Sequence, residues 1–544
     1  MATATPHRSV WLVVGGLWSL IVLGLLLRLL RAISQQANYD VDLDTYLYLG
    51  WRLTQGGLMY VESFNAKWPL VAMVFAPISQ LGSIGAYRLV VLLIDLCTGL
   101  LLGWNLLKLR RLGLLPGSLQ WPLLPAATAL TLLMSQKLIG GLSGHLHHTA
   151  NLFTVLAMTA ALAALERGRR WQPLALIGCG FWLMAAVAMR PNLVIPLGLT
   201  LAAALVIACG RRLGRWCAAM LPLVAGATLL LGVMALPYTV RPDGLARLWA
   251  GAVVLPWEWR QQTSETLTGD TSLPLELLRL LNIQVAGLRV WTLTLIPAVL
   301  LLRHCRTATH SNPAALREWC VPGLSLLNLL GLGLSFQLTH YWAHYEMMAI
   351  PALVTLICSG FSALPAAAAT GNHRNLRLLS LTGITAMSLV LVLNVFVAEL
   401  QGLANSDFAP SARQQDRARI LRFLQQQPPE ERGFISPLDF SFHWRLRQPA
   451  STVGVHRSWS LRPYDLPSSP ATRLLGIATD RSQACAQLTA PTNRFIIWER
   501  QDRPDLPDRT LLQQCLELDD HRWRDISAEV GLRRRDYTVL QRQD

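Results

Sequence analysis

Long apolar runs recur between residues 10 and 399 of this chain, and short polar segments separate them. Each run is close to the ~20 residues that an α-helix needs to cross a bilayer. The pattern therefore predicts a mainly α, polytopic membrane protein with about eleven transmembrane helices. The expected spans are 10–31, 86–107, 120–139, 148–165, 171–189, 192–209, 216–236, 285–302, 320–338, 344–362 and 377–399.

A shorter apolar stretch, Pro69 to Gly82, lies between the first two spans. We interpret it as a juxtamembrane or re-entrant helix, because counting it as a span would move Lys108, Arg110 and Arg111 to the outer face. The N-terminus is then inside, the C-terminal segment is outside, and the basic loops face the cytoplasm, which is the positive-inside pattern. The basic loops are Lys108/Arg110/Arg111, Arg167/Arg169/Arg170, Arg211/Arg212/Arg215, Arg303/Arg306 and Arg374/Arg377.

The chain from Leu403 onward has the composition of a soluble domain. Ala412–Gln427 has helical spacing, Gly433–Ser436 and Arg494–Trp498 are typical of buried strands, and Thr510–Leu518 is a second helix candidate. We therefore expect two domains. Residues 1–402 form the transmembrane domain, with outward loops 32–69 and 237–283, and residues 403–544 form a small soluble extracytoplasmic α/β domain.

Two cysteines, Cys485 and Cys515, lie in the outward segment. An oxidising compartment would allow them to form a disulfide. The sequence leaves open whether they approach each other, because pairing depends on the distance between them in the fold.

Composition agrees with a membrane protein and argues against nucleic acid as a partner. Of the 544 residues, 52% are hydrophobic and 15% are charged, compared with about 25% charged residues in ordinary soluble domains. The net charge of +16 comes from 48 Lys and Arg against 32 Asp and Glu. Much of this positive excess lies in short loops between spans, so it indicates which loops face the cytoplasm. We expect an inner or plasma membrane location.

The outward segments share one aqueous face, so candidate catalytic residues should come from them. The loop 237–283 is too long for a plain connection, and it carries Trp249, Trp257 and Trp259. We expect part of it to form an amphipathic helix at the membrane interface.

Three carboxylates follow the first span closely, at Asp40, Asp42 and Asp44. Acidic residues beside a bilayer are costly unless they bind or catalyse something. Lys67 and Trp68 follow in the same loop. A carboxylate can accept the proton of a hydroxyl group, and a lysine can neutralise a phosphate, so the loop is suited to transfer from a phosphate leaving group.

The order of these residues resembles a known family. Asp42, Tyr46, Gly57, Tyr60 and the box Lys67-Trp68-Pro69-Leu70 are similar to the first outward loop of GT-C glycosyltransferases. The nearest branch is that of the protein O-mannosyltransferases and aminoarabinose transferases. Met189-Arg190-Pro191-Asn192 and His340-Tyr341-Trp342-Ala343-His344-Tyr345 resemble later family landmarks, so the resemblance covers residues 10–400.

The resemblance implies roles for individual residues. Asp42 is the expected catalytic base, Asp40 and Asp44 are further catalytic candidates that could bind a metal or sugar hydroxyls, and Lys67 is the expected phosphate contact. The family branch often has Glu before this lysine, whereas this chain has Ala66. No metal site is therefore carried over, and a divalent metal stays open as a cofactor.

Two arginines are further candidates for the donor phosphate. Arg31 ends the first span on the outward side, and Arg190 lies at an outward corner between two spans. Interfacial anchoring or a structural pairing explains each of them equally well.

Aromatic and histidine side chains complete the candidate site. Tyr46, Tyr60, Trp68, His340, Tyr341 and His344 are expected substrate contacts. His340 and His344 have helical spacing, and His145, His147 and His148 lie close together in sequence. No metal-binding framework accompanies them, so we predict no histidine metal site.

The leading hypothesis is an integral-membrane, inverting glycosyltransferase of the cell envelope. It would use a polyprenyl-phosphate sugar and a lipid, glycan or protein acceptor on the extracytoplasmic face. A transporter or lipid flippase is one alternative, although the chain has no visible internal repeat. An O-antigen-type polymerase or ligase with a diphosphate donor is the other.

Overall fold

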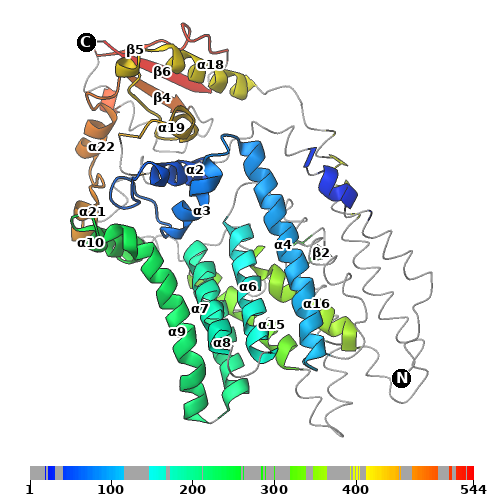
Figure 1. The fold of residues 1–544 in the computed structure, drawn as a ribbon. Helices are drawn as coiled ribbons and strands as arrows, with labels where there is room; N and C mark the ends of the chain where they lie inside the picture. Colours follow the sequence, from blue (N-terminus) through cyan, green and yellow to red (C-terminus); the bar gives the residue numbers. More distant parts are fainter. Residues whose placement is uncertain are drawn as a thin grey trace. The chain divides into compact units, whose positions relative to one another are not determined.

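The computed structural model describes the chain in segments (Figure 1). These are residues 41–115, 146–166, 172–210, 212–258, 319–338, 347–363, 412–451, 468–499, 514–516, 522–533 and 536–543, with shorter pieces in 19–30, at 261, 284–285, 288–289 and 299, in 393–404 and at 454. The chain divides into two compact units. Unit 1 contains residues 1–33, 88–231 and 270–406, and unit 2 contains 34–87, 232–269 and 407–544.

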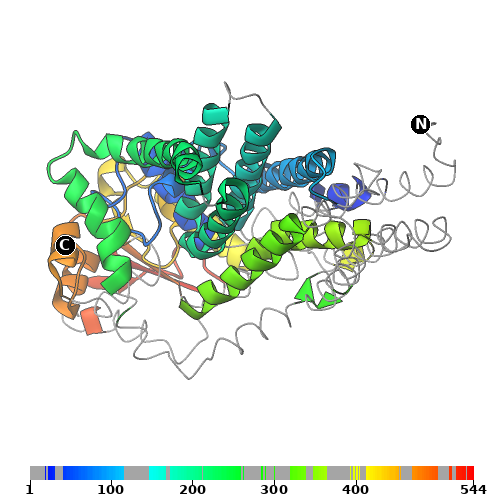
Figure 2. The same ribbon diagram turned by 90° about the horizontal axis from the view of Figure 1, so that it is seen from below.

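Unit 1 is a helix bundle, shown from two directions in Figures 1 and 2. Five helical segments are long and apolar enough to cross a membrane: Gly85–Arg111, His147–Glu166, Gln172–Met189, Pro191–Cys209 and Leu213–Tyr238. They correspond to helices α4 (Ile84–Arg111), α6 (His147–Glu166), α7 (Gln172–Met189), α8 (Val194–Cys209) and α9 (Leu213–Ala235). All five confirm helices expected from the apolar runs, with bounds shifted by a few residues.

The remaining expected spans are only partly described. Helices α15 (Cys320–Leu338) and α16 (Ile350–Ala363) lie where spans 320–338 and 344–362 are expected, and their apolar parts are shorter. The expectation that a helix begins at residue 285 is wrong. Strands β1 (Gln284–Val285) and β2 (Leu288–Arg289) pair there in antiparallel register. Most of 10–31, 120–139, 285–302 and 377–399 lies outside the described residues.

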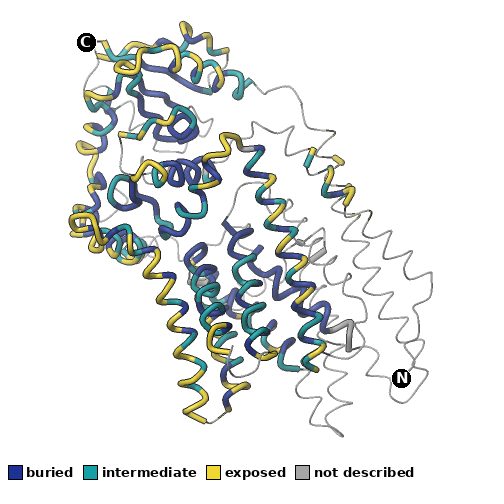
Figure 3. Tube along the Cα trace, in the orientation of Figure 1, coloured by how far each residue is buried: buried dark blue, intermediate teal, exposed yellow. Residues whose placement is uncertain are grey.

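Small residues allow the helices of the bundle to approach closely. A Cβ atom on Gly180 of α7 would lie 1.9 Å from the carbonyl oxygen of Leu223, and one on Gly226 of α9 would lie 2.0 Å from that of Ile177. Such backbone contacts are typical of membrane helices. Leucines and valines point outward along much of α9, which is largely exposed in Figure 3. An apolar exterior of this kind suits a lipid environment.

Unit 2 combines three separate parts of the chain. The first part holds α2 (Val41–Thr54) and α3 (Leu70–Ser79). The second holds the turn η3 (Leu236–Tyr238), helix α10 (Gly244–Trp249) and the π-helix η4 (Ala250–Val254). Leu245, Trp249, Val253 and Trp257 are exposed at four-residue intervals, as expected for an amphipathic helix.

The third part of unit 2 contains a four-stranded sheet in the order β3-β4-β6-β5. Strand β3 (Phe434–Ile435) is parallel to β4 (Phe495–Glu499), and β6 (Tyr537–Arg542) is antiparallel to both β4 and β5 (Trp523–Asp525). The first two strands confirm the segments expected from the sequence. The accompanying helices are α18 (Ala412–Gln426), α19 (Ser441–Leu446), α21 (Pro470–Leu475) and α22 (Arg481–Leu488).

The strands bury alternate residues on their two faces. Ile435, Ile496 and Trp498 pack with α22 residues on one face. Phe434, Phe495 and Ile497 pack with Ile420 and Leu424 of α18 on the other. Both faces of the sheet are therefore covered by helices, which explains why β4 is apolar at every position except its last.

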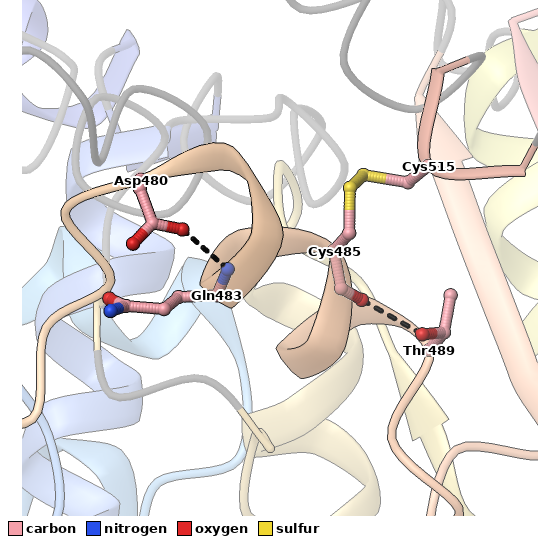
Figure 4. The surroundings of a disulfide bond; sticks show 5 residues. All are labelled: Asp480, Gln483, Cys485, Thr489 and Cys515. Carbon is pink, nitrogen blue, oxygen red and sulfur yellow. Dashed lines mark hydrogen bonds between the residues drawn. A yellow bond between two sulfur atoms is a disulfide. The ribbon is translucent and has the colours of Figure 1, made fainter. Parts of the chain in front are cut away.

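A disulfide joins Cys485 to Cys515, whose Cα atoms lie 5.1 Å apart (Figure 4). Cys485 lies in α22, which begins where Asp480 accepts a hydrogen bond of 2.9 Å from the Gln483 N–H. Thr489 ends that helix by donating its hydroxyl to the Cys485 carbonyl at 2.9 Å. The fold thus brings together the pair that the sequence left open.

Replacing both cysteines with serine is expected to lower the free energy of unfolding of unit 2 by about 2–4 kcal/mol, because the cross-link restricts the unfolded chain. Differential scanning of the purified protein, with and without reductant, measures this. The double variant and the reduced wild type should unfold at the same lower temperature. A reductant-insensitive wild type would contradict the prediction.

Candidate functional site

The first turn of α2 carries two of the three predicted carboxylates, Asp42 and Asp44. Residues two apart on an α-helix point about 200° apart around its axis. The two side chains therefore lie on nearly opposite faces of α2. Asp42 is partly exposed, whereas Asp44 is fully buried.

The Asp42 face of α2 packs against α3, and the two helices run in the same direction. The Tyr46 ring contacts the Phe75 ring, with centroids 5.4 Å apart and planes tilted by 55°. One turn later a Cβ on Gly50 would lie 2.4 Å from the backbone of Phe75. At the end of both helices, the Gln80 side-chain amide donates to the Thr54 hydroxyl at 3.0 Å. These contacts are in the same order along both helices.

A parallel pair places both amino ends together. Asp42 lies at the start of α2, and Lys67 and Trp68 immediately precede α3, so all three share this end of the pair. All three are partly exposed. Helix amino ends carry partial positive charge from unsatisfied N–H groups, which favours anions. A carboxylate and an ammonium group therefore lie at an end that can accept a phosphate.

Tyr60 supports the backbone at Lys67. The Tyr60 hydroxyl donates a short hydrogen bond to the Lys67 carbonyl, and burial raises the pKa of this phenol well above its usual value. Its backbone has a φ of 70°, in the left-handed region that few non-glycine residues adopt. Gly251 packs on its ring, where a Cβ would lie 2.3 Å away. Tyr60 is fully buried, so the contacts seen for it are internal.

Replacing Gly50 with alanine tests the close approach of α2 and α3. The added methyl meets the α3 backbone, which cannot move aside as a side chain can. We expect a loss of about 1–3 kcal/mol or more, together with loss of activity. The measurement is thermal unfolding of the purified protein. Gly232→Ala is the matched control, because nothing lies within 4 Å of a Cβ there; equal effects of both variants would refute the packing argument.

Asp44 contacts the C-terminal part of unit 2. Its Oδ1 accepts a hydrogen bond of 3.0 Å from the Trp444 indole N–H. Burial raises the pKa of Asp44 to about 7, although the nearby Arg417 favours the charged form. The sequence makes Asp44 a candidate for contact with a metal or a sugar, but the structure places its carboxyl inside the protein.

Arg190 lies in unit 1, between α7 and the turn η2 (Pro191–Leu193), and is 4% exposed. Its guanidinium is 3.4 Å from His147 Nδ1 at the start of α6. The next residue, His148, has its Nδ1 2.7 Å from Asp95 Oδ1 in α4, and both side chains are buried. The structural pairing that the sequence left open for Arg190 is therefore present.

The sequence analysis did not predict the contacts of two buried residues, Asp95 and Trp444. Asp95 is the only acidic residue in α4, and a lone carboxylate in an apolar span is a signal that could have found it. Trp444 has no such signal, because its partner Asp44 lies 400 residues away in the chain.

Several candidates lie outside the described residues: Asp40, Arg31, His145, His340, Tyr341 and His344. Within the described ranges, no group of three or more His, Cys, Asp or Glu side chains could hold a metal ion. Among the described candidates, Asp42 begins α2 and Lys67 precedes α3, and the Tyr60 hydroxyl bonds to the backbone at Lys67.

No protein-family model matches the chain, and a search of curated proteins finds no match. Two solved structures of ArnT from Cupriavidus metallidurans are similar in fold. The structure bound to undecaprenyl phosphate has a TM-score of 0.56 at 13% identity, covering 97% of this chain and 98% of that chain. The apo structure has a TM-score of 0.53 at 13% identity, covering 97% of each chain. Over nearly its whole length, this chain shares the fold of these two ArnT structures.

Proposed function

We propose that this protein is an integral-membrane, inverting glycosyltransferase that takes a sugar from a polyprenyl-phosphate donor. The observation that carries the proposal is the placement of Asp42 and Lys67 at the same end of the parallel α2–α3 pair. It is supported by the GT-C fold shared with ArnT, one structure of which is bound to undecaprenyl phosphate.

The reaction is a single displacement at the anomeric carbon. The Asp42 carboxylate takes the proton of the acceptor hydroxyl, and the hydroxyl oxygen forms a bond to the anomeric carbon. The bond from that carbon to the phosphate oxygen breaks, and its electron pair leaves with the polyprenyl phosphate. Lys67 stabilises the charge that develops on this phosphate. One displacement inverts the configuration of the sugar.

Other residues have roles that we propose on the same basis. Arg190 and Arg31 are further phosphate contacts, Asp40 is a second acid near the base, and Tyr46 and Trp68 border the sugar site. His340, Tyr341 and His344 contact the substrate. A divalent metal is a further candidate cofactor, to be tested by chelation. The acceptor is a lipid, a glycan or a protein.

We also propose the topology expected from the basic loops, with about eleven spans in the inner or plasma membrane. Residues 1–402 form the transmembrane domain, and residues 403–544 lie on the extracytoplasmic side. The disulfide between Cys485 and Cys515 supports this side, because such bonds persist in oxidising compartments.

Donor turnover by the purified protein in lipid nanodiscs tests the proposal. A panel of polyprenyl-phosphate sugars is offered with crude membrane extract as an acceptor source, and free polyprenyl phosphate is followed by mass spectrometry. Release that depends on one sugar supports a monophosphate-donor transferase. Release only from diphosphate-linked donors would instead favour the O-antigen-type polymerase or ligase.

A transporter is the second candidate, and one observation favours it. Asp95 and His148 pair inside the candidate spans α4 and α6, and buried ionisable pairs are common in proton relays. Proton-coupled uptake by reconstituted vesicles, lost in Asp95→Asn while no donor is turned over, would establish the transporter.

A further inference from the structure

The C-terminal part of unit 2 holds two successive turns of α2. Trp444 of α19 donates to Asp44, and both residues are no more than 1% exposed. One turn along α2, the Tyr48 hydroxyl accepts a hydrogen bond of 2.9 Å from the Ala450 N–H. The Tyr48 ring lies 5.4 Å from Phe440 and 5.9 Å from His443. This face of α2 is therefore tied to the segment from Phe440 to Ala450.

The loop before α3 and the end of α3 are tied to the same segment. Phe64 forms a bridge with Gly454, and the Arg447 guanidinium donates to the Ser79 carbonyl at 3.2 Å. The α2–α3 pair is thus attached at several points to one stretch of chain, residues 440–454.

Two charged groups near Asp44, Arg417 and Asp439, bond to each other. The hydrogen-bond partner observed for Asp44 is Trp444. Asp439 accepts hydrogen bonds of 2.7 Å from Arg417 and 2.9 Å from Tyr537, with further bonds from Ser441. Although burial alone would raise the pKa of Asp439, Arg417 and these hydrogen bonds lower it. Asp44 has one oxygen bonded to Trp444, and its other oxygen has no hydrogen-bond partner among the described residues.

We propose that Asp44 is a positioning residue, through which Trp444 fixes the first turn of α2 and so holds Asp42 in place. The inference rests on the proposed function, because it assigns the chemistry to Asp42. The first turn of a helix frays readily, since its N–H groups lack helical partners. Asp42 lies in this turn, two residues before the anchored Asp44. A small displacement of a base is enough to slow transfer substantially.

The test compares variants that remove an indole N–H at two positions, one with a hydrogen-bond partner and one without such a partner in the described part of the chain. Trp444→Phe keeps an aromatic ring and removes the N–H donor. The matched control is Trp523→Phe, because the Trp523 N–H is buried without a hydrogen-bond partner among the described residues. We expect Trp444→Phe to lower kcat about tenfold or more with little change in the donor KM, while Trp523→Phe stays close to the wild type.

The conservative change at Asp44 provides a second comparison. Asp44→Leu removes the acceptor and should lose kcat as Trp444→Phe does. Asp44→Asn keeps an oxygen that accepts from Trp444, and should recover most of that loss. If Asp44→Leu kept wild-type kcat, or Asp44→Asn were as impaired as Asp44→Leu, the positioning role would be overturned.

Hydrogen exchange separates this inference from the proposed function. Amides of residues 41–46 should exchange faster in Trp444→Phe than in the wild type or in Trp523→Phe. If these amides exchanged at the same rate in Trp444→Phe as in the wild type, and the wild type turned over donor, the positioning role alone would be overturned. No turnover by the wild type with any donor would overturn the proposed function, and the catalytic part of this inference with it.

The pH dependence of stability gives a further readout. Burial raises the pKa of Asp44 from 3.8 to about 7 in the folded protein, so the folded protein loses stability as the pH rises from 4 to 7. His443 opposes this in the same window, because burial lowers its pKa from 6.5 to about 4. Besides Arg417 and Asp439, Arg445 also faces Asp44. The informative quantity is therefore the difference between the wild type and Asp44→Asn, which should grow with pH.

Discussion

Asp42→Asn is expected to lower kcat for sugar transfer about 10²- to 10⁴-fold, the usual contribution of a positioned general base. Asparagine has nearly the same shape and can still accept a hydrogen bond, but it cannot take the proton of the acceptor hydroxyl. Asp42 is partly exposed at the start of α2, so the substitution should leave the melting temperature nearly unchanged. The measurement is release of polyprenyl phosphate under saturating donor.

A neutral change at an unrelated acid controls for this result. Glu430 is exposed on a turn of the C-terminal segment. The variant Glu430→Gln should therefore retain wild-type turnover. If Asp42→Asn retained wild-type turnover as well, another acid would be the base. Asp40 would then be the next residue to test, since Asp44 is fully buried.

Lys67→Ala is expected to lower kcat/KM about 10²- to 10³-fold, as removal of a single charge-stabilising donor does in other enzymes. The effect arises because the variant loses the ammonium charge that stabilises the developing phosphate charge. Lys67→Arg should recover part of the activity, since the charge is kept but the geometry differs. The donor dependence of phosphate release measures both variants.

Lys108→Ala is the matched control for the lysine. Lys108, near the C-terminal end of α4, forms an ion pair of 2.6 Å with Glu166, the last residue of α6. Partly exposed pairs of this kind contribute little to stability, so turnover should be unaffected. Normal turnover by Lys67→Ala would indicate that Lys67 is an interfacial lysine, whose stem lies along apolar surface.

Much of the fold could be predicted from local pattern. The apolar runs predict α4, α6, α7, α8 and α9, because length and hydropathy are properties of a continuous segment. Strands β3 and β4 and helix α18 are predicted for the same reason. The strand pair β1–β2 was not predicted, since the apolar residues after it favour a helix beginning at 285.

The sequence predicts candidate residues for the site but not their arrangement. The order of Asp42, Tyr46, Tyr60 and Lys67 indicates a loop that handles a hydroxyl and a phosphate. Nothing local indicates that α2 and α3 are parallel, or that Asp44 faces Trp444 in a segment 400 residues away. Contacts of such separation depend on the whole fold, and periodicity within one element carries no information about them.

The composition of unit 2 from residues 34–87, 232–269 and 407–544 has a consequence for biosynthesis. A ribosome makes α2 early, whereas Trp444, Ala450 and Tyr537 are made only after all the intervening spans. Domains fold as units once their chain has been synthesised. The contacts of α2 with the C-terminal part of unit 2 can therefore form only after most of the remaining chain has been made. A nascent or prematurely terminated chain would therefore reach the membrane with its first carboxylates unsupported. We expect such chains to be inactive, and sugar transfer to begin only when synthesis is nearly finished.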